Sequence, residues 1–274
     1  TGSGNGSYTF KITDMYDNVT TQTVNVSKID KVLPSATTQG NPVNWTNQNQ
    51  TLTITGSDAG GSGFKQIKLP SGVIVAGSSA TYTVSQNGSY SFVVYDNAGN
   101  SRTISEQVTK IDKEAPGGGI LGNPVNWTNK DATLTLNAAD TGGAGVKGVY
   151  LPNGTFVSTT TTASYVATQN GTYTFRTVDF AGNETSVSVT VTKIDKVAPT
   201  VASVGGNPTQ WTNQSQTLRV TGTDALSGVT TIKRPDNTVI NGVVTDYTVH
   251  QNGGYVFTLT DAAGNSATHT VDVT

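Results

Sequence analysis

Gly40-Asn-Pro-Val-Asn-Trp-Thr-Asn47 occurs again as Gly122-Asn-Pro-Val-Asn-Trp-Thr-Asn129 and, with two changes, as Gly206-Asn-Pro-Thr-Gln-Trp-Thr-Asn213. The tryptophans of this octapeptide lie 82 and 84 residues apart. A period near 83 is longer than the roughly 20 to 50 residues of solenoid or propeller units, and it fits a small domain of seven short strands. The sequence therefore predicts tandem domains.

Two further motifs repeat with the same period. The pattern Asn-Gly-x-Tyr-x-Phe starts at Asn5, Asn87, Asn170 and Asn252, and Lys-Ile-Asp-Lys occupies 28–31, 110–113 and 193–196. The Asn-Gly pair suits a turn inside a domain, whereas the proline that follows each Lys-Ile-Asp-Lys bars a central strand and marks a linker. We therefore expect domains at 35–116, 117–199 and 200–274, preceded by a partial repeat at 1–34 that holds only the last two strands of a unit and the linker.

The first full unit shows how a repeat is built. Residues 50–55 alternate polar and apolar side chains, as a half-buried strand does. No stretch keeps a helical period for more than two turns, and turn signals every ~8 to 12 residues are typical of an all-β sandwich. With a segment around Trp45, the unit has seven predicted strands, of which the other six are 50–55, 64–69, 73–75, 81–84, 90–95 and 101–108.

Three motifs together carry a resemblance to a known family. Tyr90 enters the sixth strand, where immunoglobulin-type sandwiches place a tyrosine whose hydroxyl ties down the preceding corner. With Asp-x-Ala-Gly-Asn at 96–100 and Lys-Ile-Asp-Lys before proline, the repeat resembles the bacterial immunoglobulin-like (Big-type) repeats of Gram-positive surface and secreted proteins. The resemblance implies a rod of tandem seven-stranded immunoglobulin-like β-sandwiches preceded by an orphan β-hairpin, and an extracellular, cell-surface or cell-wall location.

Composition excludes several classes of function. The 274 residues carry 16 basic and 18 acidic side chains, and charged residues make up 12% of the chain, about half the usual ~25%. A near-neutral chain without basic clusters has no field to attract nucleic acid or anionic lipid, and no apolar stretch is long enough for membrane insertion. The absence of cysteine excludes disulfides, zinc-thiolate sites and thiol chemistry.

Aspartates recur at three places in each repeat: in the linker, after the second strand, and at the hairpin that follows the sixth strand. In an immunoglobulin-type sandwich these places lie at one end, so carboxylates from separate loops could supply the oxygens that calcium prefers. The alternative is that each aspartate caps its own turn, and that the flanking lysines neutralise the charge of the linker aspartate. The three candidate calcium clusters are Asp30, Asp58 and Asp96; Asp112, Asp140 and Asp179; and Asp195, Asp224 and Asp261.

Neither the tryptophans nor the histidines indicate catalysis. Trp45, Trp127 and Trp211 could form sugar-stacking platforms, but their fixed place beside a strand favours a role as core plugs. His250 and His269 both lie in the final unit and are expected at the surface, without the partners that a Ser/His/Asp site needs. Apart from the calcium hypothesis, no cofactor is expected.

The function expected from these features is that of a non-enzymatic stalk or filament segment of a bacterial cell-surface protein, which spaces or presents a functional tip. Its expected partners are neighbouring repeats of the same polypeptide. One alternative is an adhesin module that binds a host or matrix protein or a glycan, and another is an accessory region of a secreted hydrolase.

The first 34 residues raise a separate question. Two strands alone cannot bury Tyr8, Phe10, Ile12 and Val24, and isolated hairpins are marginal in water. Residues 1–34 therefore either complete a sandwich on a neighbouring chain by strand addition or are left as a lone hairpin because the fragment was cut there. The cut is the favoured explanation. Light scattering with and without these residues separates the two.

Overall fold

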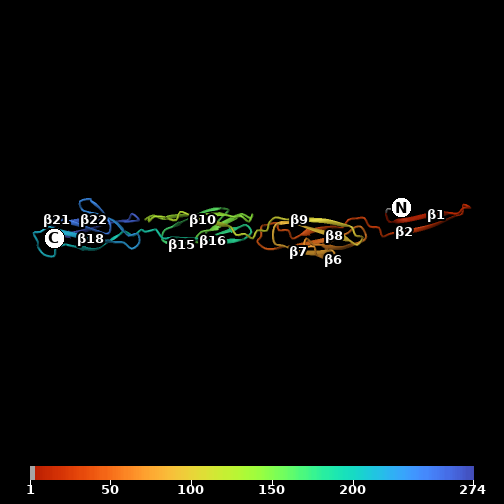
Figure 1. Cartoon of the computed structure of the whole chain (residues 1–274), viewed down its shortest axis with the longest axis horizontal. Coiled ribbons are helices and arrows are strands. Elements are labelled where there is room, and N and C mark those ends of the chain that lie inside the picture. Colours follow the sequence, from red (N-terminus) through yellow and green to blue (C-terminus); the bar gives the residue numbers. More distant parts are fainter. Residues whose placement is uncertain (1–3) are drawn as a thin grey trace. The chain divides into compact units, whose positions relative to one another are not determined.

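The computed structural model describes residues 4–274, and within that range the chain is all-β, with no helix (Figure 1). Its strands form one two-stranded sheet, three three-stranded sheets and three four-stranded sheets in the described part of the chain. All pairings between these strands are antiparallel. The expected fold class is therefore confirmed as an all-β chain built of several small sheets.

A β-hairpin comes first in the chain. Strand β1 (Gly6–Thr13) pairs with β2 (Val19–Val26), and the Asp14 carboxylate closes the turn by accepting backbone N–H bonds from Tyr16 and Asn18. The apolar side chains of this hairpin stay exposed, by 57% for Phe10 and Ile12 and 46% for Val24. The hairpin therefore has no core of its own.

The next seven strands form what we call the first sheet pair. Its three-stranded sheet has the order β3-β4-β7 and its four-stranded sheet the order β6-β5-β8-β9. The bounds are β3 Ser35–Gln39, β4 Gln50–Ser57, β5 Phe64–Lys68, β6 Ile74–Ala76, β7 Ser79–Val84, β8 Gly88–Asp96 and β9 Ser101–Val108.

The same topology occurs twice more, in the second and third sheet pairs. The second has β10 Gly117–Leu121, β11 Ala132–Ala139, β12 Val146–Tyr150, β13 Phe156–Ser158, β14 Thr162–Ala167, β15 Gly171–Asp179 and β16 Glu184–Val191. The third has β17 Thr200–Gly205, β18 Gln216–Thr223, β19 Val229–Lys233, β20 Val239–Asn241, β21 Val244–Val249, β22 Gly253–Asp261 and β23 Ser266–Val273.

Each sheet pair has a separate hydrophobic core, to which both of its sheets contribute. In the first pair, Leu52 and Ile54 of β4 join Phe92 and Val94 of β8 with almost no exposed surface. The alternation predicted for residues 50–55 is visible in β4, where buried residues alternate with more exposed ones. Small cores of this kind explain the low apolar content of the chain, because small domains expose a large fraction of their surface.

One predicted strand was wrong. The seventh strand of the first sheet pair is β3 at 35–39, and not the segment around Trp45, which contributes only an isolated bridge between Thr46 and Ile111. The proline that argued against a strand is Pro34, directly before β3. Because proline is tolerated just ahead of an edge strand, β3 can begin immediately after it and pair with β4 on one side.

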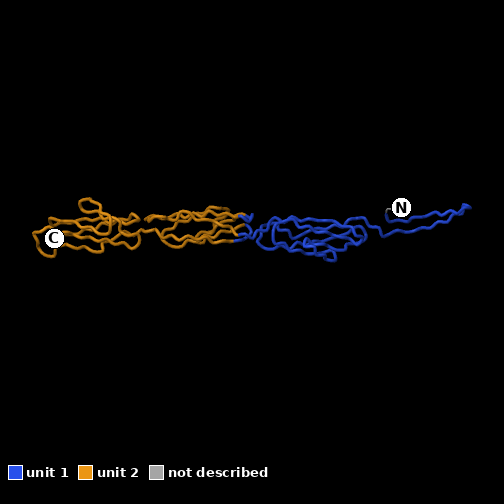
Figure 2. Tube along the Cα trace, in the orientation of Figure 1, with its two compact units in different colours: residues 1–114, 141–144, 180–183 blue, residues 115–140, 145–179, 184–274 orange. Residues whose placement is uncertain are grey.

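The chain divides into two compact units, which Figure 2 colours separately. One comprises the residues up to 114 together with 141–144 and 180–183, and it holds the hairpin and the strands of the first sheet pair. The other comprises 115–140, 145–179 and 184–274, and it holds the strands of the second and third pairs. The finer division at 116/117 and 199/200 stays a prediction.

A tyrosine ties down the turn that enters the sixth strand of each sheet pair. The hydroxyl of Tyr90 donates to the Gln86 carbonyl oxygen at 2.7 Å, Tyr173 to Gln169 at 2.7 Å, and Tyr255 to Gln251 at 2.7 Å. The role predicted for this tyrosine is therefore confirmed.

We expect Tyr173→Phe to lower the free energy of unfolding by about 1 kcal/mol, because it removes one hydrogen bond and leaves the ring packing on Tyr165. Tyr165→Phe is the matched control, since the Tyr165 hydroxyl has no hydrogen bond within residues 4–274, and it should change stability by less than about 0.5 kcal/mol. Urea unfolding measures both. Equal losses for the two variants would contradict this role of the Tyr173 hydroxyl.

Candidate functional site

The structure brings Asp30, Asp58 and Asp96 together. Asp30 lies in the segment between β2 and β3, Asp58 directly follows β4, and Asp96 ends β8. One carboxylate oxygen from each lies within 4.8 Å of the others. The loop after β4 can approach Asp30 this closely because it carries Gly60, where a Cβ atom would collide with the Asp30 carboxylate.

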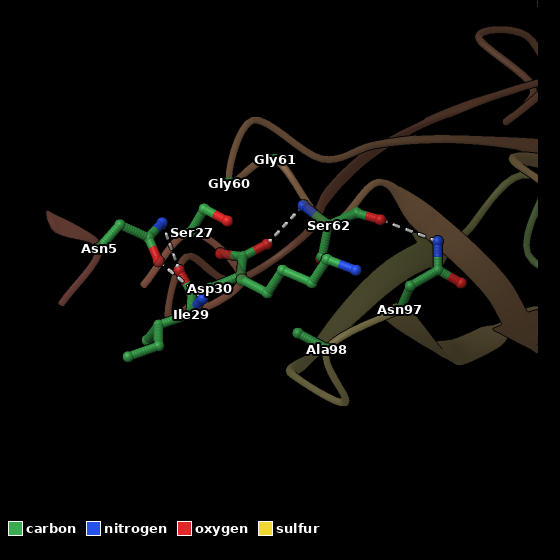
Figure 3. Close-up of a pocket in the computed structure, with 10 residues that line it drawn as sticks. Asn5, Ser27, Ile29, Asp30, Gly60, Gly61, Ser62, Asn97 and Ala98 are labelled. Atoms are coloured by element: carbon green, nitrogen blue, oxygen red, sulfur yellow. Dashed lines mark hydrogen bonds between the residues drawn. The ribbon is translucent and has the colours of Figure 1, made fainter. Parts of the chain in front are cut away.

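Backbone N–H groups hold the Asp30 carboxylate in place. Its Oδ2 accepts from the Ser62 N–H at 2.9 Å, which Figure 3 shows, and its Oδ1 accepts from the Val32 N–H at 2.9 Å. Hydrogen bonds from Ser62 and Val32 lower the pKa of Asp30 below its ordinary value. Beside it lies a hollow of about 370 Å³ whose lining includes Asn5, Gly60 and Asn97.

The other two carboxylates of this cluster also order their own loops. Asp58 accepts from the Gly63 N–H at 3.0 Å, and Asp96 accepts from both the backbone and the side chain of Asn100 at 2.7 Å. The Asn100 amide reaches on to the carbonyl oxygen of Asp30 at 3.2 Å. Each aspartate therefore caps its own turn, as the alternative to calcium predicted, and the three carboxylates still meet.

A second cluster of the same composition lies at one end of the third sheet pair. Asp195 precedes β17, Asp224 follows β18 and Asp261 ends β22, again with oxygens within 4.8 Å of one another. Asp195 is 1% exposed and Asp261 3% exposed. The Asn265 amide donates to the Asp261 carboxylate at 2.7 Å and to the carbonyl oxygen of Asp195 at 2.9 Å, so the loops are joined as in the first cluster.

The charge state of Asp195 follows from two opposed effects. Burial raises the pKa of this carboxyl, but backbone N–H bonds from Val197 at 3.0 Å and Ser227 at 3.0 Å help to outweigh it, so the pKa lies below its ordinary value. Asp195 is therefore a buried carboxylate anion near neutral pH.

No ion pair among residues 4–274 joins a lysine or arginine side chain to the carboxylates of this second cluster. The lysines on either side of Asp195 are directed elsewhere, Lys193 to the Val125 carbonyl oxygen and Lys196 to Asp131. Oδ1 of Asp224 is buried and accepts no hydrogen bond from any described residue. The expectation that flanking lysines neutralise the linker aspartate is therefore wrong here, because those side chains reach to other groups.

Backbone N–H groups also bind two of the remaining three candidates. Asp112 accepts from the N–H groups of Glu114 at 3.0 Å and Ala144 at 2.7 Å, and Asp140 accepts from the Gly145 N–H at 2.6 Å. Asp179 ends β15 and is fully buried. All three therefore occupy the places in the repeat that the sequence predicted for them.

The tryptophans are not core plugs. None belongs to the three described core clusters, Trp45 and Trp127 are half-buried, and Trp211 is 95% exposed. The cores are filled instead by phenylalanines of the sixth strands, Phe92, Phe175 and Phe257. The tryptophans lie in the loops that connect the first and second strands of each sheet pair, so their repetition did not indicate burial in a core. For Trp211, the alternative of a stacking platform stays open.

Sequence reasoning missed a recurring contact between the linker and the core. Ile111 and Ile194, from the Lys-Ile-Asp-Lys segments, are each 4% exposed and belong to the cores of the first and second sheet pairs. The side chains of Asn87 and Asn170 bind the backbone of these isoleucines. The sequence signal for this contact was the shared period of the Asn-Gly and Lys-Ile-Asp motifs. Taken separately, the first motif indicates only a turn and the second only a linker.

The histidines lie at the surface, as predicted. His250 and His269 are exposed, and Nδ1 of His250 is 2.7 Å from the Ser215 hydroxyl.

No helix among residues 4–274 is long and apolar enough to cross a membrane.

Comparisons with known proteins give only distant similarities. No family model matches the sequence, and no curated protein matches it. Among solved structures, the chain is similar to Escherichia coli alpha-2-macroglobulin in its native conformation (9% identity, TM-score 0.24, 98% of this chain and 25% of that one). It is also similar to dimeric latent PorU from Porphyromonas gingivalis (13% identity, TM-score 0.21, 94% of this chain and 36% of that one) and to Salmonella alpha-2-macroglobulin reacted with methylamine (9% identity, TM-score 0.21, 98% and 25%). The chain thus spans about a quarter to a third of these proteins, and TM-scores this low do not establish a shared fold.

Proposed function

We propose that this chain is a non-enzymatic stalk or filament segment of a bacterial cell-surface protein. It is built of seven-stranded immunoglobulin-like sandwiches at 35–116, 117–199 and 200–274, similar to Big-type repeats. Such a segment acts by geometry: each domain adds a constant length, and the connections between domains resist bending, so that a functional tip is held away from the cell.

The observation that carries this proposal is the burial of Ile111 and Ile194, which come from the segments that connect successive sheet pairs. Asn87 binds both the N–H and the carbonyl oxygen of Ile111, at 2.8 and 2.9 Å, and Asn170 does the same for Ile194. A linker whose side chain is part of a core loses the freedom that a Gly/Ser linker keeps. This supports stiff connections, which a stalk requires.

Small-angle X-ray scattering of the whole chain tests the proposal. A compact protein of 274 residues has a radius of gyration of about 19 Å, and a stiff stalk should have at least about twice that value. Replacing Lys193-Ile194-Asp195-Lys196 by Gly-Ser-Gly-Ser should broaden the distance distribution and lower the maximum dimension, while the two flanking sandwiches stay folded by circular dichroism. A radius near 19 Å, or equal scattering from both proteins, would reject the stalk.

We further infer that the cluster of Asp195, Asp224 and Asp261 binds calcium. Three carboxylates this close repel by about 3 kcal/mol per pair at an effective dielectric constant of ~20, and two of them are buried. The Oδ1 atom of Asp224 is buried without a hydrogen bond, and Lys193 and Lys196 are directed elsewhere. A hard cation bound by carboxylate and carbonyl oxygens would neutralise the negative charge of the cluster and would be coordinated by Oδ1 of Asp224.

A further inference from the structure

A row of four side chains crosses the outer face of the four-stranded sheet in the second sheet pair. Tyr150 of β12 lies opposite Phe156 of β13 on one side and opposite Arg176 of β15 on the other. Arg176 in turn lies opposite Ser186 of β16. The residue before Tyr150 and the residue before Arg176 are fully buried. Because side chains alternate between the two faces of a strand, the row points away from the core.

The aromatic rings and the guanidinium of this row form one contact surface. The ring centroids of Tyr150 and Phe156 are 4.7 Å apart, with 43° between the ring planes. The guanidinium carbon of Arg176 lies 3.9 Å from the centroid of the Tyr150 ring, and Arg176 also forms an ion pair with Glu184. Phe156 is 38% exposed. The row therefore presents apolar ring surface beside an arginine whose charge is already paired.

A hollow of about 380 Å³ lies along the row. Tyr150 and Arg176 line it, and so do the hydroxyl-bearing side chains of Thr174 and Ser186, which are both exposed. The turn after β12 contributes three further residues to the lining, which are Leu151, Pro152 and Gly154. The hollow thus combines ring surface, a guanidinium and hydroxyl groups, and its volume lies in the usual range of ligand pockets.

A glycine lets the Phe156 ring lie across the sheet. A Cβ atom at Gly148 would lie 2.6 Å from Cζ of Phe156, so a side chain there would displace the ring. The corresponding residues of the first and third sheet pairs are Gln66 and Thr231, which both carry side chains. The position of this ring over the sheet is therefore particular to the second sheet pair.

The other two sheet pairs have the same strands without the aromatic row. The residues that correspond to Phe156, Tyr150 and Arg176 are Ile74, Lys68 and Val93 in the first pair, and Val239, Lys233 and Thr258 in the third. A hollow also lies at this place in the third pair, but no aromatic side chain lines it. All three pairs share one topology, so the fold requires neither the rings nor the arginine. Their presence in one pair points to a local function.

We propose that this face of the second sheet pair binds a neutral oligosaccharide made of pyranose rings with equatorial substituents. Such a ring has an apolar face of C–H groups and a rim of hydroxyl groups. The apolar face stacks on the rings of Phe156 and Tyr150. At the rim, the Arg176 guanidinium donates hydrogen bonds to sugar oxygens, and the Glu184 carboxylate accepts them from sugar hydroxyls.

The charge and the place of the hollow favour this occupant over others. Arg176 is paired with Glu184, so an anionic ligand would have to displace a carboxylate that already holds the guanidinium. A peptide that adds as a strand needs a free sheet edge, whereas the row is centred on β12 and β15, the two inner strands of the sheet. The inference goes beyond the proposed stalk and depends neither on it nor on calcium.

Isothermal titration calorimetry of the whole chain with cellohexaose, a β-1,4-linked glucose hexamer, tests the proposal. Cellohexaose should bind to one site with a dissociation constant below about 1 mM. Because the paired charges leave no net charge to screen, the affinity should be the same at low and high salt. Sialyllactose, which carries a carboxylate, should bind at least about tenfold more weakly.

Three variants take the residue that another sheet pair has at the same place, so the same topology already accommodates each side chain. Tyr150→Lys and Phe156→Ile should each weaken cellohexaose binding at least about fivefold, because a stacked ring is lost. Arg176→Thr should weaken it about tenfold by removing charge-assisted hydrogen bonds. Val166→Thr is the matched control, since Val166 is 50% exposed on the other sheet, where both other sheet pairs have threonine. It should bind like the unchanged chain.

A second measurement needs no variant. Addition of cellohexaose to the unchanged chain should shift the nuclear magnetic resonances of the Tyr150 and Phe156 ring protons, and it decides the question if a variant melts at a lower temperature. No saturable binding of cellohexaose up to about 5 mM, equal affinity of the unchanged chain and a folded ring variant, or unmoved ring resonances would overturn the proposal. Tighter binding of sialyllactose than of cellohexaose would also overturn it and would assign the hollow to an anionic ligand of Arg176.

Discussion

Calcium at about 10 mM should raise the melting temperature of the third sheet pair by on the order of 10 °C. Extracellular calcium modules have dissociation constants of roughly 10⁻⁴ to 10⁻³ M, so this concentration stabilises a single site by about 1.4–2.7 kcal/mol. In a domain of this size, each kcal/mol shifts the melting temperature by about 4–8 °C. Scanning calorimetry of the whole chain, with calcium and with a chelator, measures the shift.

Asp224→Asn separates calcium binding from turn capping. Asp224 Oδ2 accepts the loop N–H bonds from Leu226 at 3.0 Å and Gly228 at 2.8 Å, and the side-chain oxygen of asparagine can take over both. The variant should therefore melt at the same or a higher temperature without calcium, because one repelling charge is gone, and should lose more than half of the calcium shift.

Asp236→Asn is the matched control for this variant. Asp236 lies in an exposed turn of the same sheet pair, accepts the Thr238 N–H at 2.9 Å and belongs to no acidic cluster of the described residues. Its calcium shift should equal that of the unchanged chain. If neither the unchanged chain nor the control responds to calcium, the cluster is only a set of turn caps and the calcium proposal fails.

Ile194→Ala should lower the stability of the second sheet pair by about 2–5 kcal/mol. Ile194 is 4% exposed and part of that core, so truncation loses buried apolar surface and leaves a cavity. Because the same residue anchors the linker, proteolytic cleavage between 192 and 199 should also become faster. Calorimetry and timed limited proteolysis measure the two effects.

Val197→Ala is the matched control in the same linker. Val197 is 60% exposed, so its truncation should change stability by less than about 0.5 kcal/mol and leave the cleavage rate unchanged. Similar effects of the two substitutions would mean that the linker is not part of the core. That result would also remove the main support for stiff connections between the proposed domains.

Much of the strand pattern could be predicted from local sequence. The predicted strand at 101–108 matches β9, and those at 50–55, 64–69 and 90–95 lie within two residues of β4, β5 and β8 at each end. Alternation of apolar side chains and Asn-Gly or glycine-rich turns carry this information, because both reflect neighbours along the chain. The strand β3 was missed because its sequence, Ser-Ala-Thr-Thr-Gln, has little alternation and only pairing with β4 makes it a strand.

The site was predicted only in part. The recurrence of aspartate at three places in each repeat indicated that carboxylates from separate loops would meet, and in the clusters that contain Asp30 and Asp195 they do. That Lys193 and Lys196 turn away from Asp195, and that Oδ1 of Asp224 is left without a hydrogen bond, depends on side-chain directions. A sequence does not encode those directions locally.

The sequence by itself determined the all-β class, the period near 83 residues, the turns, and the places of the aspartates and the corner tyrosine, because each of these follows from residue type and spacing. Only the tertiary structure decided what is buried. It placed Trp211 in solvent and Ile194 of the linker in a core, the reverse of what we expected for the tryptophan. Burial depends on which surfaces meet after the chain has folded. A motif that repeats along the chain shows only that its place in the fold recurs, and not whether that place is buried.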